Sequence, residues 1–370
     1  IRKKRKQMKN IIKTVVLFAS VISFSSANAG ALDVTGTAKV TYNIQSSDST
    51  TGNNDASKNV GITNELAFTG TGELDNGYTW KYQVELDDNA SGATTSDDTR
   101  LELTTPYGTV AAYNTEGSLN TKYKFSAAAY GAGSDNGNGG SMNYGSSIDS
   151  YNNVQYHTPA DLLPFSIMAK AAFAPGAQSA KVSGNSAGTA KAEANATQYQ
   201  LTAAPIDGLA IGASYFEKSG ESSANRQGYQ SGGYYAKYDS GQFTVGAGRS
   251  YVAQNSEGGA SQTATTDLSV AANKAAVDDF TNTAVSLGYK VNDALSVSVE
   301  RERSDAAKKT VVLSAAADTD VSVELEVDTI QAAYTMGGMT MSLSQKKLDN
   351  ADYVLGKKEK ETLVALVMAF

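Results

Sequence analysis

Few residues of this chain could carry out chemistry by themselves. The sequence has no cysteine, which excludes thiol catalysis and a disulfide framework. His157 is the single histidine, so neither a histidine-based catalytic site nor a histidine-rich metal site is expected. The acidic residues also lack the fixed alternation of a calcium-binding loop. Any function therefore depends on charged side chains and on the elements that position them, and no cofactor is expected.

The first 29 residues have the pattern of a secretory signal. Seven basic residues precede a short apolar stretch at residues 14–24, and Ala27, Asn28 and Ala29 fit the small-residue cleavage pattern. The mature chain is therefore predicted to begin at Gly30. The apolar stretch is too short for a membrane helix, and no other run approaches the roughly 18 apolar residues that such a helix needs. The sequence thus excludes a helical membrane protein.

Removal of the signal makes the chain strongly acidic. The whole sequence has 31 Lys and Arg residues and 38 Asp and Glu residues. Because the signal holds seven basic and no acidic residues, the mature chain keeps 24 basic against 38 acidic residues, a net charge of −14. This charge disfavours nucleic acid as a partner and favours a solvated acidic surface or lumen.

The mature sequence alternates between apolar and polar side chains, the pattern of a strand with lipid on one face and water on the other. In the first such segment, Val34, Val40 and Tyr42 share one face and Thr35 and Thr41 the other. The pattern predicts sixteen strands, at about residues 32–45, 62–72, 78–87, 100–103, 109–113, 151–157, 165–173, 197–203, 209–216, 233–239, 242–251, 279–289, 295–303, within 321–334, from 339 and at 361–370. The register changes within 321–334, where a bulge near Asp328 and Thr329 would reconcile the two halves.

Short and long connections alternate along the chain. Seven are short turns and eight are longer polar loops, the longest early one lying at about residues 114–150. Bacterial outer-membrane barrels have short periplasmic turns and long outer loops. The predicted fold is therefore all-β, a sixteen-stranded antiparallel transmembrane β-barrel that forms one domain over residues 30–370.

The last ten residues indicate how the barrel closes. Val364, Leu366, Met368 and Phe370 occupy alternate positions, and about 9–11 residues suffice for a tilted strand to cross a bilayer. A closed barrel has no free edge, so this strand is expected to pair with the first. A buried strand of a soluble protein is the alternative for these residues alone.

Four stretches carry a resemblance to a known family. They are residues 73–85 (Glu-Leu-Asp-Asn-Gly-Tyr-Thr-Trp-Lys-Tyr-Gln-Val-Glu), residues 101–113 with the turn Pro-Tyr-Gly-Thr-Val, residues 152–159 (Asn-Asn-Val-Gln-Tyr-His-Thr-Pro) and the terminal Phe370. Because these stretches occur in this order and spacing, the chain resembles the trimeric general diffusion porins of Gram-negative bacteria. It is nearer to their alphaproteobacterial branch than to the enterobacterial one. The resemblance implies an outer-membrane homotrimer with one water-filled pore per subunit, passive diffusion of small hydrophilic solutes and ions, and a third loop folded into the lumen.

The resemblance also implies a constriction in which loop acids face wall bases. The candidates are Glu116, Asp135 and Asp149 on the loop and Lys39, Lys81, Arg100 and Lys170 on the wall. The sequence departs from the enterobacterial pattern, because its third loop lacks a run of the Pro-Glu-Phe-Gly-Gly type. In addition, Glu65, Glu85 and Glu102 lie at positions predicted to face the lumen, close to the bases. With the net charge of the mature chain, this predicts a mild cation preference.

Lipid, lipopolysaccharide and the barrel-assembly machinery are the implied partners, with Phe370 as the assembly signal. Asp87, Asp88, Asp97 and Asp98 could hold divalent cations that bridge lipopolysaccharide, or could simply be solvated loop residues.

Three other functions stay open at this stage. An outer-membrane enzyme would have to rely on His157, which is predicted near a periplasmic turn. A substrate-specific channel is the second possibility: a sugar channel would use an aromatic slide in the third loop, and a phosphate channel would use a cluster of Arg and Lys there. A purely structural surface barrel is the third possibility. The slide candidates are Tyr123, Phe125, Tyr130 and Tyr144 with Lys122 and Lys124.

Overall fold

Alternating side chains shape the mature chain into strands, as the sequence predicts. The computed structural model describes residues 30–48, 56–88, 94–140, 142–160, 162–176, 195–219, 229–253, 277, 279–308 and 321–370. The predicted signal at residues 1–29 lies outside the described residues. The described strands are β1 (Leu32–Asp48), β2 (Ala56–Glu73), β3 (Thr79–Asp88), β4 (Thr94–Thr105), β5 (Gly108–Asn114), β6 (Asn153–His157), β7 (Met168–Ala174), β8 (Asn195–Ala203), β9 (Leu209–Ser219), β10 (Tyr229–Asp239), β11 (Phe243–Ala253), β12 (Asp279–Lys290), β13 (Leu295–Lys308), β14 (Val321–Met336), β15 (Met339–Asp349) and β16 (Lys358–Ala369).

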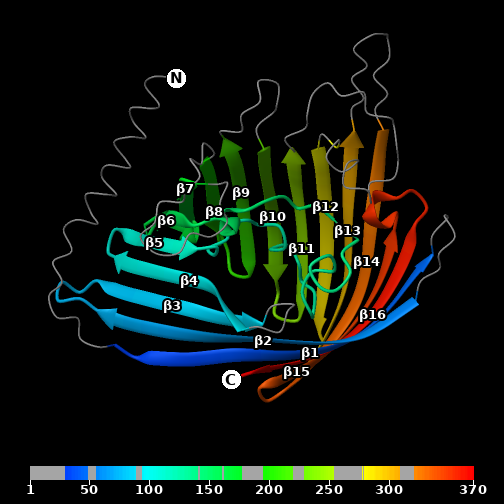
Figure 1. Cartoon of the computed structure of the whole chain (residues 1–370), viewed down its shortest axis with the longest axis horizontal. Helices are drawn as coiled ribbons and strands as arrows, with labels where there is room; N and C mark the ends of the chain where they lie inside the picture. Colours follow the sequence, from blue (N-terminus) through cyan, green and yellow to red (C-terminus); the bar gives the residue numbers. More distant parts are fainter. Residues whose placement is uncertain are drawn as a thin grey trace, which may run out of the picture.

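The strands form one closed antiparallel barrel in which each strand pairs with its neighbours in sequence (Figure 1). The predicted closure is confirmed, because β16 pairs with β1 and places Val364 opposite Tyr42. Two backbone hydrogen bonds between Gly36 and Phe370, of 2.9 and 3.0 Å, complete the seam. No helix among the described residues has the length and apolar character that a membrane-spanning helix requires.

The two faces of the wall follow the predicted parity. On β16 the even set faces outward, where Val364 is 38% and Met368 45% exposed, whereas Glu361 and Ala365 on the odd set are each 1% exposed. Apolar side chains therefore cover the outside, as they must if the wall contacts hydrocarbon.

Several strands begin earlier or end later than predicted, mainly at the long-loop end. β2 begins at Ala56 and β13 ends at Lys308. Beyond the hydrocarbon the wall meets water, so a strand can continue with polar residues on both faces, and this removes the alternation on which the prediction rests.

β7, in contrast, begins later than predicted, at Met168. Phe165, predicted in this strand, lies in the short helix η2 (Pro164–Ser166) with a φ of 60°, because Pro164 has no N–H for the ladder and the left-handed residue breaks the pleat.

The predicted bulge in β14 is absent, which corrects the sequence interpretation. β14 keeps one continuous register with both β13 and β15. Its odd residues from 323 to 333 face the interior, and Val323, Leu325 and Val327 are 5%, 0% and 0% exposed. The apolar side chains change face because protein fills this part of the barrel interior, where they join a buried apolar cluster.

Two inward-folded loops provide that filling. L3, residues 115–140 and 142–152 with the short helix η1 (Ile148–Ser150), lies inside the barrel (Figure 1). L8, residues 350–357 with the short helix η3 (Ala351–Tyr353), packs beside it. Together with the wall they bury one apolar cluster that includes Phe280, Leu325 and Tyr353, and L3 contributes Leu119 and Ile148 to a second.

Candidate pore and its lining

Glycines on the inner wall allow L3 to approach closely. A Cβ atom at Gly246 would lie 1.8 Å from the carbonyl oxygen of Phe125, and one at Gly288 would lie 2.5 Å from that of Ala127. Gly248 lies under the ring of Phe125, which is 1% exposed. The bare backbone of β11 and β12 therefore forms a track into which this part of L3 fits.

Buried carboxylates on β13 accept hydrogen bonds from the middle of L3. Glu300 accepts from the N–H of Gly133 at 2.7 Å and from the hydroxyl of Ser126 at 2.5 Å. Glu302 accepts from the N–H of Ser134 at 2.7 Å and from its hydroxyl at 2.6 Å. All four carboxylate oxygens are thus engaged by the loop, which fixes its position against the wall.

A buried ion pair holds the tip of L3. Lys346 and Glu361 are opposite each other on β15 and β16, and their side chains pair at 2.6 Å with both side chains 0% exposed. Lys346 also donates to the carbonyl oxygens of Gly133 at 3.1 Å, Asn136, and Asn138 at 2.8 Å, while Glu361 accepts from the N–H of Asn138. The pair satisfies backbone groups of the loop that would otherwise be buried without partners.

L8 covers this arrangement from the mouth of the barrel. The N–H of Asp352 donates to the carbonyl oxygen of Gly140 at 2.9 Å. Tyr353 is 1% exposed, and its hydroxyl bonds that of Ser304 at 2.6 Å. Burial raises the pKa of Tyr353 to about 12, so its hydroxyl keeps its proton at neutral pH. Since L3 and L8 fill the β11–β16 side, the open lumen lies toward β1–β7.

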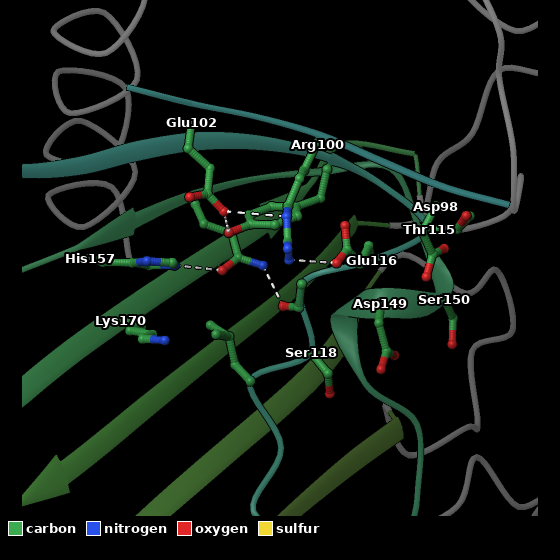
Figure 2. A pocket seen from close by; sticks show the side chains of 14 residues that line it. Asp98, Arg100, Glu102, Thr115, Glu116, Ser118, Asp149, Ser150, His157 and Lys170 are labelled. Carbon is green, nitrogen blue, oxygen red and sulfur yellow. Dashed lines mark hydrogen bonds and ion pairs between the residues drawn. The ribbon is translucent and has the colours of Figure 1, made fainter. Parts of the chain in front are cut away.

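A cavity of about 790 Å³ opens in the lumen at the base of L3 (Figure 2). Four of the predicted constriction residues line it together. Arg100 comes from β4, Lys170 from β7, and Glu116 and Asp149 from L3. Loop acids and wall bases therefore meet across one opening.

Arg100 is the central cation of this cavity. Its guanidinium pairs with Glu116 at 2.7 Å and with Glu102 at 3.8 Å, and it donates to the amide oxygen of Gln83. Glu102 also accepts from the hydroxyl of Tyr113 at 3.0 Å. Figure 2 shows Arg100 between the two glutamates. One positive charge is thus shared by two carboxylates.

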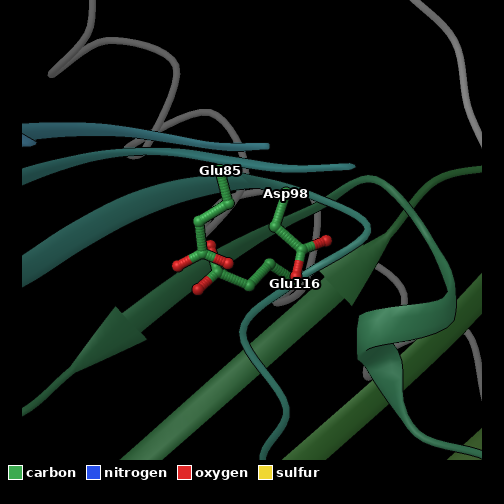
Figure 3. Close-up of side chains that lie close together, drawn as sticks. All are labelled: Glu85, Asp98 and Glu116. Carbon is green, nitrogen blue, oxygen red and sulfur yellow. The ribbon is translucent and has the colours of Figure 1, made fainter. Parts of the chain in front are cut away.

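A group of acids lies beside this pair. One carboxylate oxygen from each of Glu85, Asp98 and Glu116 lies within 4.8 Å of the others (Figure 3). Burial raises the pKa of Glu116, and this effect outweighs the opposing influence of Arg100. The cluster thus places three acidic side chains together on this side of the opening.

The other predicted residues lie apart from the cavity. Lys81 is opposite Glu102 in the β3–β4 register, and its charge also acts on Glu116. Lys39 lies on β1 opposite Thr63 of β2. Asp135 is exposed on L3 and does not line the cavity.

Sequence reasoning missed several residues of the site. Asp98, considered as an outer-loop cation ligand, lies on the described cavity wall because β4 begins at Thr94. His157 also lines the cavity, where its Nε2 atom lies 2.8 Å from Gln155. The L3 anchors Glu300, Glu302, Lys346 and Glu361 have inward parity, which could have placed them in the lumen, but parity cannot show which part of the wall L3 covers.

A closed antiparallel barrel with an apolar outer wall, a polar lumen and an inward-folded loop is the architecture of a membrane channel. The model of the Gram-negative porin family matches residues 14–367. The chain therefore belongs to this family, whose members are non-enzymatic diffusion channels of the outer membrane. A comparison with curated proteins finds no match.

Solved structures share the fold at low sequence identity. A loop-deleted OmpT, an outer membrane protein of Vibrio cholerae, has 13% identity and a TM-score of 0.64 over 93% of this chain and 100% of its own. OmpF of Salmonella typhi, in complex with daunomycin, has 15% identity and a TM-score of 0.60 over 92% and 98%. An anion-selective porin from Comamonas acidovorans has 13% identity and a TM-score of 0.64 over 92% and 100%.

Proposed function

We propose that this porin is a general diffusion channel with a mild cation preference, narrowed where L3 faces the β4–β7 wall. The observation that carries the proposal is the charge balance of the cavity. Asp98, Glu102, Glu116 and Asp149 line it, against the cations Arg100 and Lys170. An aqueous pore with more carboxylates than cations lowers the energy of a passing cation relative to an anion.

Within this proposal the predicted charges have different weights. Glu116, Asp149, Arg100 and Lys170 form the constriction, since they share one cavity. Lys81 adjusts the potential through Glu102 and Glu116. Lys39 and Asp135 contribute only to the wider lumen, along the wall and on L3.

The rival function, a sugar-specific channel, receives little support from the aromatic residues of L3. Phe125 is 1% exposed because its ring packs against Gly248 of the wall, and the hydroxyl of Tyr144 donates to Glu302. Tyr144 also packs edge-on against Tyr123 at a centroid distance of 5.0 Å. These rings hold L3 in place, so they are not arranged as a slide for a solute.

The remaining partners follow from the family. The chain is proposed to assemble as a homotrimer in contact with lipid and lipopolysaccharide, after export through the signal at residues 1–29. The barrel-assembly machinery would recognise the closing strand through Phe370. No catalytic role is proposed for His157, whose Nε2 atom lies at hydrogen-bond distance, 2.8 Å, from the amide oxygen of Gln155.

Single-channel recording of the refolded mature protein in a planar bilayer tests the proposal. Large conductance in steps of three, with a reversal potential shifted toward that of the cation in a KCl gradient, is the expected result. A shift toward the anion would contradict the cation preference. A small conductance blocked by a sugar would favour the substrate-specific channel instead.

A further inference from the structure

On β15 and β16 the apolar band of the outer wall ends, toward the long loops, at Leu343 and Val364. Met341 and Leu343 on β15 are 55% and 49% exposed, and Val364 and Met368 on β16 are 38% and 45% exposed. About 9–11 residues carry a strand across the bilayer. Counted from the short-turn end, Lys360 therefore lies where β16 leaves the hydrocarbon on the long-loop side.

Two lysines lie opposite each other at this boundary. Lys347 of β15 and Lys360 of β16 are direct cross-strand partners, and both are exposed. They point outward, because their neighbours Lys346 and Glu361 point into the barrel. Like charges at opposed positions of adjacent strands destabilise a sheet. This outer lysine pair, Lys347 and Lys360, therefore lowers the stability of the wall as long as no anion lies between the two ammonium groups.

The carboxylates next to the pair are bound to other cations. Asp328, opposite Lys347, accepts two hydrogen bonds of 2.6 Å from Arg301. Asp349 pairs with Lys358 at 3.4 Å. Within the described part of the chain, the outer lysine pair has no ion-pair partner. Its positive charge is thus available to an anion outside the barrel.

We propose that the outer lysine pair binds the phosphate of a lipid headgroup in the outer leaflet. Two adjacent ammonium groups can donate charge-assisted hydrogen bonds to one phosphate, and they lie at headgroup depth. Below the pair, the outer wall continues with Gln345 and Thr362 and then with Leu343 and Val364, and this apolar row contacts the acyl chains of the same molecule. A lipid satisfies both features, whereas free phosphate satisfies only the first. The inference rests on the outer-membrane placement and names residues for the proposed lipid partner.

Native mass spectrometry of the full mature protein in detergent tests the site, with lipid A and dephosphorylated lipid A as probes. The variant is Lys347→Gln/Lys360→Gln. The control is Lys290→Gln, which changes an exposed lysine paired with Asp239 at the short-turn end of β12. Loss of charge-assisted hydrogen bonds is expected to weaken lipid A binding by the double variant about tenfold or more, with the control unchanged. Wild type should bind dephosphorylated lipid A as weakly as the double variant binds lipid A.

Several results would overturn the site. These are equal binding of lipid A by wild type and double variant, equal binding of the dephosphorylated probe, or displacement of lipid A by an equal concentration of inorganic phosphate. Dissociation of the oligomer with lipid binding retained would instead assign the pair to a subunit contact. Conductance of the same samples separates the two proposals, because a wild type that binds lipid A without conducting would contradict the channel and leave the lipid site standing.

Discussion

Arg100 is shared among more acceptors than it can neutralise. It contacts Glu102, Glu116 and Gln83, while Glu85 and Asp98 cluster beside Glu116. Carboxyl groups therefore outnumber the arginine at this point. For this reason the selectivity depends on which single charge is removed.

Glu116→Gln should lower the cation preference, and Arg100→Gln should raise it. A unit charge at ~4 Å in water is worth about 1 kcal/mol, which is roughly a fivefold change in the local ratio of ions. Reversal potentials in a KCl gradient measure both changes. Glu217→Gln, an exposed position on the outer face of β9, is the matched control and should leave the potential unchanged.

The cation preference should also decline on acidification. Burial holds the pKa of Glu116 above the ordinary value of 4.5, so as the pH falls this carboxylate takes up its proton before an exposed glutamate does. Protonation removes a negative charge next to Arg100 and shifts the balance toward anions. Reversal potentials measured across a pH series should show the decline beginning above pH 4.5 in wild type, and the same step persisting in Glu116→Gln would contradict this assignment.

At the scale of elements, the packing of L3 decides the shape of the lumen. Gly246 and Gly288 leave space for its backbone, and Lys346 and Glu361 hold its tip. The same packing explains why Val323, Leu325 and Val327 of β14 face inward. Changes at the buried anchors should therefore affect both stability and pore size.

Lys346→Met should destabilise the barrel strongly. Removing one partner of a buried pair leaves an uncompensated charge, which costs about 3–5 kcal/mol. Lys358→Met, at an exposed pair with Asp349, should cost no more than about 1 kcal/mol. Denaturant unfolding of both variants measures the difference. Equal losses of unfolding free energy in the two variants would mean that Lys346 does not hold L3. A stability partly restored in Lys346→Met/Glu361→Leu would show that the unpaired charge of Glu361 causes the loss.

Gly246→Ala should narrow the pore. The added Cβ would lie 1.8 Å from the carbonyl oxygen of Phe125, so L3 has to move away from the wall and into the lumen. Reduced single-channel conductance is the expected readout. Ala247→Val adds volume to the outer face of the same strand and serves as the control. An unchanged conductance in Gly246→Ala would mean that L3 relaxes along the wall.

At the scale of the whole molecule, the water path is displaced to one side of the barrel. L3 and L8 fill the β11–β16 side, whereas inner residues of β2, such as Glu65, are exposed. The barrel is therefore asymmetric although its strands are regular. The charges of β1–β7 line the path of the solute, and those of β13–β16 hold the filling in place.

Single-cysteine variants should reveal this asymmetry, since the natural chain has no cysteine. Glu65→Cys should react readily with a charged thiol reagent added from water. Ser344→Cys, on the inner face of β15 where the serine is 1% exposed, should react slowly. Mass spectrometry of the folded protein measures both rates, and denatured samples give the reference for each cysteine. Comparable rates in the folded barrel would show that both sides carry water.

The sequence by itself determined the barrel, the number of strands, the pairing of β16 with β1 and the face of most side chains. Those features follow from alternation and connection length, which are local properties set by contact with lipid on one side and water on the other. Only the tertiary structure decided where the lumen is open. Val323, Leu325 and Val327 also alternate with polar residues, but here the apolar side chains face the interior and not the lipid. They do so because L3 and L8 occupy the space behind them. The roles of Lys346, Glu361 and the outer lysine pair likewise depend on which residues meet across strands and loops distant in sequence, and a local pattern contains no record of those contacts.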